Sequence, residues 1–234
     1  MSNISNYCYD EGGVYIKGLQ NTAEQLGIGQ YRFPHCYELE GKDFTVTAGG
    51  KDYAISFECK HFAKFNGVKC DYEIEKLNKE LYFVRFGIEA VAVLDLEAGQ
   101  AALVVGDDVL PGVIAGSGAN APKFTTDDMV ETKVRWILGC GRYITQDFIA
   151  ADKLRASWSP LDEKFTEVPY KAVKFRDSFY FVAERSFELK NVCAPFFTNK
   201  VFMLQDYERC MTVGCVMGTG FDPIMIAGYA KFVD

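Results

Sequence analysis

The chain has 234 residues, of which 49% are hydrophobic and 15% aromatic, so it is long enough to bury a core in one large domain or two ordinary ones. Its formal net charge is −7 and its Lys and Arg residues form no cluster, which excludes an extended surface for nucleic acid. No apolar run reaches the length of a membrane span, and residues 1–6 lack the features of a secretory signal. We therefore expect a cytoplasmic protein with neither a nucleic-acid nor a membrane partner.

The first half begins with a predicted helix and continues as strands. Residues 19–26 are the best helical candidate, and Gly27 and Gly29 would end that helix. From about residue 40, short alternating or aromatic runs are separated by Gly, Asn and Asp, a pattern typical of an antiparallel β meander. The clearest predicted strands of this half are residues 44–48, 53–57, 81–86, 90–94 and 101–105.

Residues 111–120 are rich in Gly and are predicted to connect two halves of the chain. The second half holds extra residues before Tyr170 and again before Val201. The later insertion contains residues 191–197, an apolar loop that either covers a barrel mouth or packs on its own side chains. We divide the chain into an extension (1–36), a first half (37–108), a connector (109–128) and a second half (129–234).

An internal repeat relates the two halves. The turn and strand led by Tyr53 have a counterpart led by Tyr143. Residues 72–84 match residues 170–182 without a gap, and a third matching block follows in the same order in both halves. Many short strands at regular spacing favour a barrel, so the sequence predicts two copies of one antiparallel β unit.

The repeated blocks resemble the molybdenum cofactor biosynthesis protein F family, whose members carry two lipocalin-like (calycin) halves in tandem. The similar segments are residues 39–44, 82–84 and 93–99 in the first half, and residues 143–158, 177–185 and the strand ending at Gly218 in the second. The resemblance implies a mainly all-β fold, with two tandem lipocalin-like antiparallel β-barrel repeats and a short N-terminal helical segment. Where family members tend to place an aromatic residue after the central strand motif, this chain has Glu184.

The central strand of the second repeat carries the candidate chemistry. Alternation places Tyr180, Val182 and Glu184 on one face, and Ala183 and Arg185 on the other. If the first set faces the lumen, burial among rings raises the pKa of the Glu184 carboxyl, and a neutral acid beside a phenol suits general acid–base catalysis. If it faces outward, Arg185 is the inward candidate.

The two histidines are further candidates, because the pKa of imidazole lies near neutrality. His61 shares a strand face with Cys59, and His35 lies before the first strand, where an entry segment often crosses one end of a barrel. Cys59, His61 and Cys70 do not supply a fourth zinc ligand, so we expect no metal. The other candidate ligand contacts are Tyr82, Arg85, Tyr143, Trp158 and Arg185.

The eight cysteines include no CxxC pair, and we expect all of them to be free thiols. The sequence also lacks a P-loop, a Gly-x-Ser-x-Gly motif, a His-Glu-x-x-His motif and a dinucleotide-binding fingerprint. We therefore expect a protein that works without a cofactor.

Two classes of function fit these observations. In the first, a barrel lumen binds a small apolar or aromatic molecule and also transforms it by cofactor-free acid–base catalysis, as a lyase, decarboxylase, isomerase or cyclase. Phenolic acid decarboxylases are the fold-level analogy, since their similar calycin barrel works with Tyr, Arg and Glu. In the second, the chain is a non-catalytic lipocalin-like binding protein, and homodimerisation stays open. We predict a functional pocket in the second repeat, with Tyr180 and Glu184 inside it, His61 as a further acid or base, and a first repeat filled by its own rings.

Overall fold

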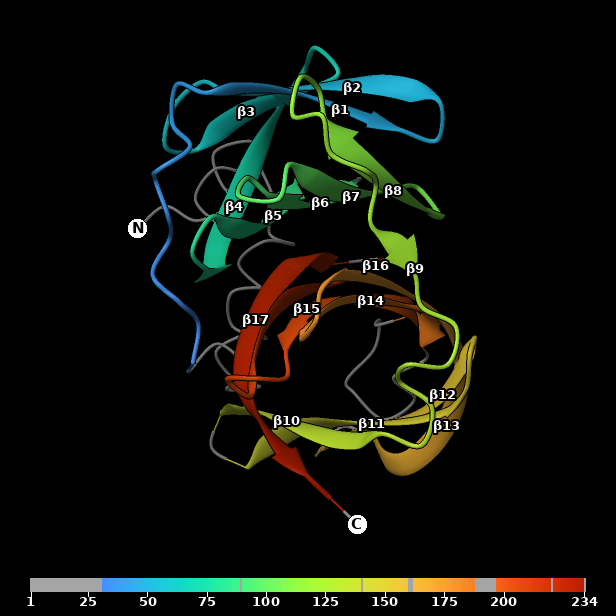
Figure 1. Cartoon of the computed structure of the whole chain (residues 1–234). Coiled ribbons are helices and arrows are strands. Elements are labelled where there is room, and N and C mark those ends of the chain that lie inside the picture. Colours follow the sequence, from blue (N-terminus) through green and yellow to red (C-terminus); the bar gives the residue numbers. More distant parts are fainter. Residues whose placement is uncertain are drawn as a thin grey trace.

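In a computed structural model, the described residues (31–88, 90–139, 141–159, 162–187, 197–219 and 221–233) form two antiparallel β barrels in tandem (Figure 1). The first barrel consists of β1 (Asp43–Ala48), β2 (Lys51–Phe57), β3 (Phe62–Phe65), β4 (Val68–Asn78), β5 (Leu81–Phe86), β6 (Ala90–Asp95), β7 (Gln100–Val105) and β8 (Asp108–Ile114). Each strand pairs with the next one, and β8 returns to β1 and closes the barrel.

Closure of the first barrel depends on Gly112 in β8. In the β1–β8 register, Gly112 lies opposite Ala48, and a Cβ atom at Gly112 would come within 2.7 Å of the Ala48 Cβ and of the Thr47 carbonyl oxygen. Only a residue without a side chain allows this approach. The boundary predicted at residue 108 therefore falls too early, because Pro111 and Gly112 suggested a connector but lie in the closing strand.

The second barrel has the same strand order as the first. Its strands are β10 (Lys133–Gly139), β11 (Arg142–Ala150), β12 (Lys153–Ser159), β13 (Asp162–Arg176), β14 (Phe179–Phe187), β15 (Phe197–Asp206), β16 (Met211–Thr219) and β17 (Phe221–Phe232). Pairing of β10 with β17 and of β12 with β13 closes it, and the short strand β9 (Lys123–Phe124) adds to the free edge of β13.

The predicted repeat coincides with this duplicated strand order. Residues 72–84 lie on β4 and β5, and the matching residues 170–182 lie on β13 and β14. The segment before the first strand also recurs, because Leu39 and Met129 are each buried in the core of their own barrel. The predicted fold of two tandem antiparallel barrels is thus confirmed, whereas the helix predicted at residues 19–26 lies outside the described residues.

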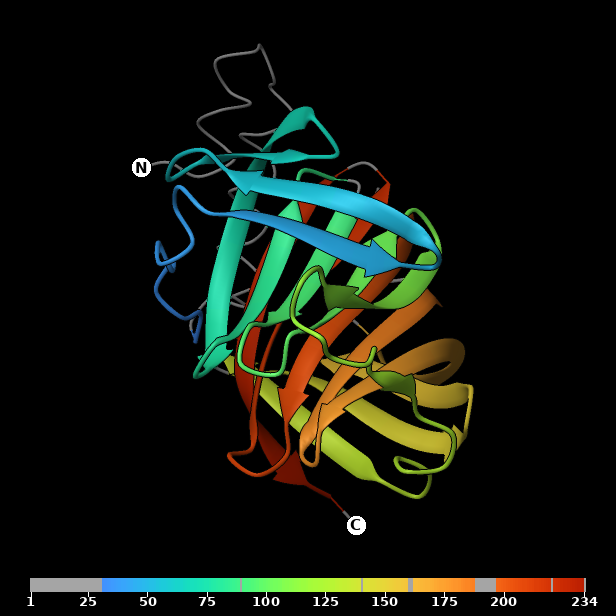
Figure 2. The ribbon, with the colours of Figure 1, turned by 45° about the horizontal axis from the view of Figure 1, so that its top comes forward.

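The two barrels pack against each other through a continuous apolar seam. Figures 1 and 2 show β5, β6 and β7 facing the orange and red strands of the second barrel. The rings of Phe83 and Phe181 meet across the seam with centroids 6.4 Å apart, and Phe181 stacks on Phe202 at 6.5 Å. Every side chain of β5 and β6 is buried, since one strand face lines the lumen and the other lines the seam.

Ion pairs join the two barrels beside this seam, and one of them has a fully buried partner. Arg176 of β13 contacts both oxygens of Asp95 in β6, at 2.6 Å through Nε and 2.5 Å through Nη2, and it also reaches Glu97 at 3.0 Å. Asp95 is fully buried, so this bidentate contact provides the charge partner that a buried carboxylate requires.

The described residues contain no helix long and apolar enough to cross a bilayer.

Replacing Phe83 by Ala should destabilise the protein by about 3–5 kcal/mol, because it removes a fully buried ring from the seam and leaves a cavity. Urea unfolding followed by circular dichroism measures this change. Phe165→Ala is the control, since the ring of Phe165 is 46% exposed and should contribute within about 0.5 kcal/mol. Equal losses for the two variants would show that the seam does not hold the barrels together.

Candidate functional site

The lumen of the first barrel is filled by its own rings. Phe57 lies 5.1 Å from Tyr72 and 5.9 Å from Phe86, and Phe86 lies 5.3 Å from Phe65, all between ring centroids. The buried residues of this lumen cluster are aliphatic or aromatic, and Tyr72 and Tyr82 are its polar members. The described lumen residues of the first barrel thus form a cluster of packed rings that includes no buried carboxyl and no buried imidazole.

The lumen of the second barrel contains aromatic and polar side chains together. Alternation along β14 places Tyr180 and Val182 in the lumen cluster and Glu184 on the same face, as the inward reading of the sequence requires. Both tryptophans of the chain, Trp136 and Trp158, also belong to this cluster. Tryptophan fluorescence of this protein therefore reports on the second lumen alone.

Glu184 lies near the middle of β14 in the sequence and is 1% exposed. Its partners in the sheet register are Tyr170 on β13 and Val201 on β15, both of which are buried in the lumen cluster. The side-chain amide of Gln146 donates a hydrogen bond to Oε1 of Glu184. Burial raises the pKa of the Glu184 carboxyl to about 7, and the hydrogen bond from Gln146 opposes that rise.

A chain of hydrogen bonds fixes the orientation of the Gln146 amide. The indole N–H of Trp136 donates to Gln146 Oε1 at 2.7 Å, and Gln205 Nε2 donates to the same oxygen at 2.8 Å. The hydroxyl of Tyr207 then donates to Gln205 Oε1 at 2.9 Å. Because an indole N–H can only donate, the oxygen of Gln146 must face Trp136 and its NH₂ must face Glu184.

The buried acid and its amide partner replace two apolar residues of the first barrel. In the sheet register, Phe86 pairs with Tyr72 as Glu184 pairs with Tyr170. Ile55 pairs with Phe44 in β1 and β2, and Gln146 pairs with Val134 at the matching place in β10 and β11. The two lumens thus differ at two matching positions, where apolar side chains of the first barrel are replaced by hydrogen-bonded side chains in the second.

Tyr180 lies toward the rim and apart from Glu184. Four residues along one strand separate them, which corresponds to roughly 13 Å between Cα atoms. The Lys174 ammonium lies 5.4 Å from the centroid of the Tyr180 ring and pairs with Asp128 at 2.9 Å. The tyrosine that pairs with Glu184 in the register is instead Tyr170, whose hydroxyl donates a hydrogen bond to the Ala150 carbonyl at 3.1 Å.

The rim of the first barrel repeats this arrangement. The Lys76 ammonium lies 5.2 Å from the centroid of the Tyr82 ring and pairs with Glu38, which also accepts a hydrogen bond from the Tyr82 hydroxyl at 2.9 Å. Glu38 precedes the buried Leu39, just as Asp128 precedes the buried Met129. In each barrel the segment before the first strand therefore covers the rim beside the paired lysine.

The structure places the two predicted histidines in the first barrel, away from Glu184. His61 is exposed in the turn between β2 and β3. His35 lies beside Tyr37 and Tyr72, with ring centroids 4.5 and 5.7 Å away. Burial lowers the pKa of His35, so the neutral imidazole is favoured. Neither histidine joins the acid in the second lumen.

Two other predicted ligand contacts face away from the lumens. Arg85 is fully buried on the outer face of β5, where Nη1 lies 2.8 Å from Asp71 Oδ2 and 2.8 Å from the Gly87 carbonyl oxygen. Tyr143 lies on the outer face of β11, with the Arg135 guanidinium 4.3 Å from its ring centroid. A register shift between Ile137 and Gly139 moves Tyr143 off the face that the simple match with Tyr53 implied.

The remaining predicted features of the second barrel are one ligand contact inside the lumen and two features that the structure does not describe. Trp158 lies in the lumen, whereas the side chain of Arg185 and residues 191–196 of the apolar loop lie outside the described part of the structure. The sequence analysis missed Gln146, Gln205, Trp136 and Tyr207. The signal for Gln146 was present, because Ile144, Gln146 and Phe148 alternate along one strand and share its inward face.

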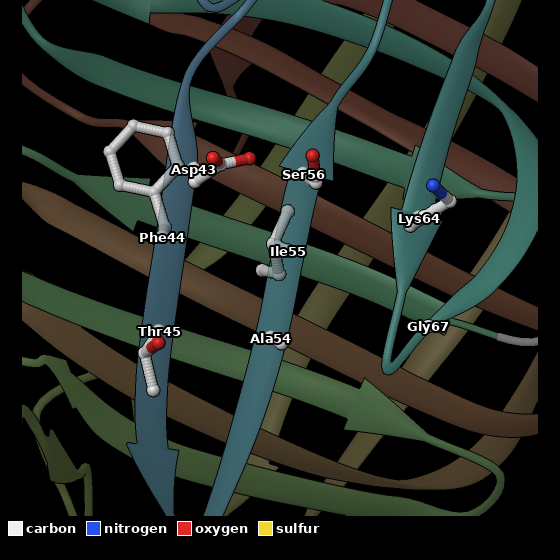
Figure 3. Close-up of a pocket in the computed structure, with 8 residues that line it drawn as sticks. All are labelled: Asp43, Phe44, Thr45, Ala54, Ile55, Ser56, Lys64 and Gly67. Atoms are coloured by element: carbon white, nitrogen blue, oxygen red, sulfur yellow. The ribbon is translucent and has the colours of Figure 1, made fainter.

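A separate surface pocket of about 300 Å³ lies on the first barrel (Figure 3). Its lining residues belong to β1, β2, β3 and the turn after β3, and they are Asp43, Phe44, Thr45, Ala54, Ile55, Ser56, Lys64 and Gly67. Its two charged side chains are exposed, and Lys64 pairs with Glu58. This groove brings together none of the predicted site residues.

Within the described ranges, no group of three or more His, Cys, Asp or Glu side chains is placed to hold a metal ion. Five cysteines fall in those ranges, and no disulfide joins any two of them, namely Cys36, Cys59, Cys70, Cys210 and Cys215. Cys8, Cys140 and Cys193 lie outside them.

No protein-family model and no curated protein matches this chain. Among solved structures, a crystal structure described as a "putative beta-lactamase from Burkholderia vietnamiensis" aligns with 12% sequence identity and a TM-score of 0.39. The alignment covers 47% of this chain and 99% of that chain. Likeness at this level carries no argument about function.

The buried acid predicts a specific pH dependence of stability. Since the folded-state pKa of Glu184 is raised from 4.5 to about 7, its contribution is fully present below pH 4.5 and is lost as the pH rises to about 7. Relative to Glu184→Gln, the wild type should therefore lose roughly 3 kcal/mol of unfolding free energy between those limits. Urea unfolding of both proteins at pH 5, 6, 7 and 8 measures the difference.

Glu75 provides the matched control for this measurement. It is also buried with a pKa raised to about 7, but it lies on the outer face of β4 and pairs with Arg32 at 3.2 Å. Glu75→Gln should leave the Glu184 component unchanged, so the two substitutions should act independently. A pH-independent difference between wild type and Glu184→Gln would contradict the burial of an ionisable Glu184.

Proposed function

We propose that the second barrel binds a small apolar or aromatic molecule in its lumen and that Glu184 acts on it as a general acid or base without a cofactor. The observation that carries this proposal is a buried carboxyl with a pKa near neutrality in a lumen lined by Trp136, Trp158 and Tyr170. Buried acids with shifted pKa values cluster at functional sites, since both protonation states are then available at neutral pH.

A comparison of the two lumens supports the choice of the second barrel as the binding site. Duplication provides two barrels whose lumens both hold contacting rings, yet the second also holds Glu184 and Gln146 at the places of Phe86 and Ile55. Burying an acid and an amide costs stability compared with apolar packing. A functional requirement for the second lumen accounts for that cost.

The reaction classes that suit one buried acid are proton transfers within a single substrate. Decarboxylation with protonation, isomerisation, elimination and cyclisation each need a proton to be delivered or removed at one position, and none needs a redox group. A ring-lined lumen excludes water from such a step. The ring of Tyr170, which neighbours Glu184 in the sheet register, is positioned to contact the substrate, whereas Tyr180 contributes to the rim.

Two tandem barrels are also what a resemblance to the molybdenum cofactor biosynthesis protein F family implies. They support our proposal that the chain is a distant relative of that family.

A non-catalytic binding protein is the second candidate. It is favoured by the self-contained polar chain, in which Trp136, Gln146, Gln205 and Tyr207 satisfy one another. In that case Glu184 would serve as a polar anchor that selects the ligand, as the few polar groups of apolar pockets commonly do.

Occupancy of the second lumen can be tested with the neutral apolar probe N-phenyl-1-naphthylamine. Binding should quench the tryptophan fluorescence and transfer its energy to the probe, since both tryptophans line this lumen. Val182→Phe fills the second lumen and should weaken probe binding at least ~10-fold, the worth of a lost apolar contact of about 1.4 kcal/mol.

The duplication provides the matched control. Val84 occupies on β5 the position of Val182 on β14, and it lies in the lumen of the first barrel. Val84→Phe should leave probe binding unchanged, with circular dichroism confirming that both variants fold. Loss of binding in Val84→Phe alone would place the ligand in the first barrel and refute the proposal.

The catalytic half of the proposal is tested through the retained ligand. Mass spectrometry of molecules extracted from freshly purified wild type and Glu184→Gln should identify different compounds, product in one and unreacted substrate in the other. With the substrate known, Glu184→Gln should lower kcat by roughly 10²–10⁴-fold at saturating substrate. Recovery of one identical compound from both proteins would instead establish the non-catalytic alternative.

A further inference from the structure

The buried carboxyl in the second lumen has no oppositely charged partner among the described residues. Its described lumen side chains include one carboxyl, that of Glu184, and burial together with the Gln146 hydrogen bond accounts for the pKa of that group without a contribution from any described charge. Lys174 at the rim is already paired with Asp128 at 2.9 Å and is 36% exposed. Lys174 pairs with Tyr180 in the register, whereas Glu184 pairs with Tyr170, so Lys174 lies about four residues along the strand from the partner of Glu184.

The immediate surroundings of Glu184 have donors for only one of its oxygens. Gln146 donates to Oε1, and no described donor reaches Oε2. The neighbouring side chains across the sheet are the ring of Tyr170 and the aliphatic Val201. The hydroxyl of Tyr170 is already bound to the Ala150 carbonyl, so it presents a ring rather than a donor to the carboxyl.

A carboxyl in these surroundings is complementary to a cation. A buried carboxylate without a charge partner is costly, and an ammonium group would supply both the missing charge and N–H donors for the second oxygen. Aromatic faces attract cations as well, and Tyr170 occupies the register position directly opposite Glu184. An anionic ligand would meet repulsion at the same place, and a neutral one would leave the carboxyl protonated.

We propose that the ligand of the second lumen is an apolar organic cation, whose ammonium group pairs with Glu184 while its apolar body lies among the lumen rings. This inference rests on the proposed function and specifies its ligand class. Gln146 is a positioning residue in this site, because its Trp136 contact directs an N–H at Oε1 and leaves Oε2 to the ligand.

Cation binding should also release protons. At pH 6 the Glu184 carboxyl is mostly neutral, and pairing with an ammonium group favours the carboxylate, so up to one proton should be released per ligand bound. The other titratable groups that face this space from the packed strands are Tyr170, Tyr180, Tyr207 and the Lys174–Asp128 pair. Burial raises the pKa of Tyr170 to about 12 and also raises the pKa of Tyr207. A proton release that is lost in Glu184→Gln therefore reports the Glu184 carboxyl.

The test compares three probes of matched apolar body, 4-phenylbutylamine, 4-phenylbutanol and 4-phenylbutanoate, by tryptophan fluorescence and by calorimetry in two buffers of different ionisation enthalpy. The amine should bind roughly 10- to 100-fold more tightly than the alcohol, the factor expected of one charge-assisted hydrogen bond, and the acid most weakly. Proton release at pH 6 should accompany binding of the amine and not of the alcohol.

Glu184→Gln should reduce the amine-to-alcohol ratio to about one. Glu75→Gln, which alters a buried acid outside the lumen, should leave the ratio intact. Equal affinity for the three probes, or tightest binding of the acid, would overturn the cation inference and leave lumen binding standing. An amine preference that survives in Glu184→Gln would overturn it as well. Failure of all three probes, together with N-phenyl-1-naphthylamine, to change the tryptophan emission would refute the proposed function itself.

Discussion

The packing of one barrel wall against the other is the contact on which the rest of the structure depends. A barrel strand normally has a lumen face and a solvent face, and only the first must be apolar. Here β5 and β6 are buried on both faces, and the outward residues of β14 and β15, such as Phe181 and Phe202, complete the seam. The seam joins the two barrels and shields the shared wall of each from water.

That shared wall also explains where the buried acid lies. Glu184 is on β14, whose outer face carries Phe181 and Ala183 into the seam. A strand held on its outer face by another barrel has little freedom to move, so Glu184 and its Gln146 partner sit on a firmly supported wall. The acid is therefore desolvated from the inside by lumen rings and from the outside by the first barrel.

The two barrels illustrate how duplication allows one copy to retain packing while the other changes. Phe86 contacts the rings of Phe57 and Phe65, and this close packing contributes to the stability of the first lumen. At the matching place Glu184 instead depends on a hydrogen-bonded amide. Because the polar chain through Gln146, Gln205 and Tyr207 is continuous, each member satisfies the next, which limits the cost of placing polar groups in a core.

Local patterns in the sequence were sufficient for the five strands named in the first half, the duplication and the shared face of Tyr180 and Glu184. Each of these follows from residue type and from the two-residue period of a strand, which is a property of neighbouring residues. The same reasoning failed at Gly112, because the need for glycine arises from the approach of β1, about 64 residues earlier in the chain. It also misplaced Tyr143, since a register shift of one residue reverses the face of a side chain.

The choice of which face points inward, and of what surrounds Glu184, was decided only by the tertiary structure. Alternation is symmetric, so Glu184 and Arg185 were equivalent candidates until closure of the barrel gave each face a different environment. Gln146 lies 38 residues from Glu184 in the sequence, and their contact exists because β11 and β14 face each other across the same lumen. A pKa depends on desolvation and on such distant partners, so the chemistry of this carboxyl is a property of the closed barrel and not of the strand that carries it.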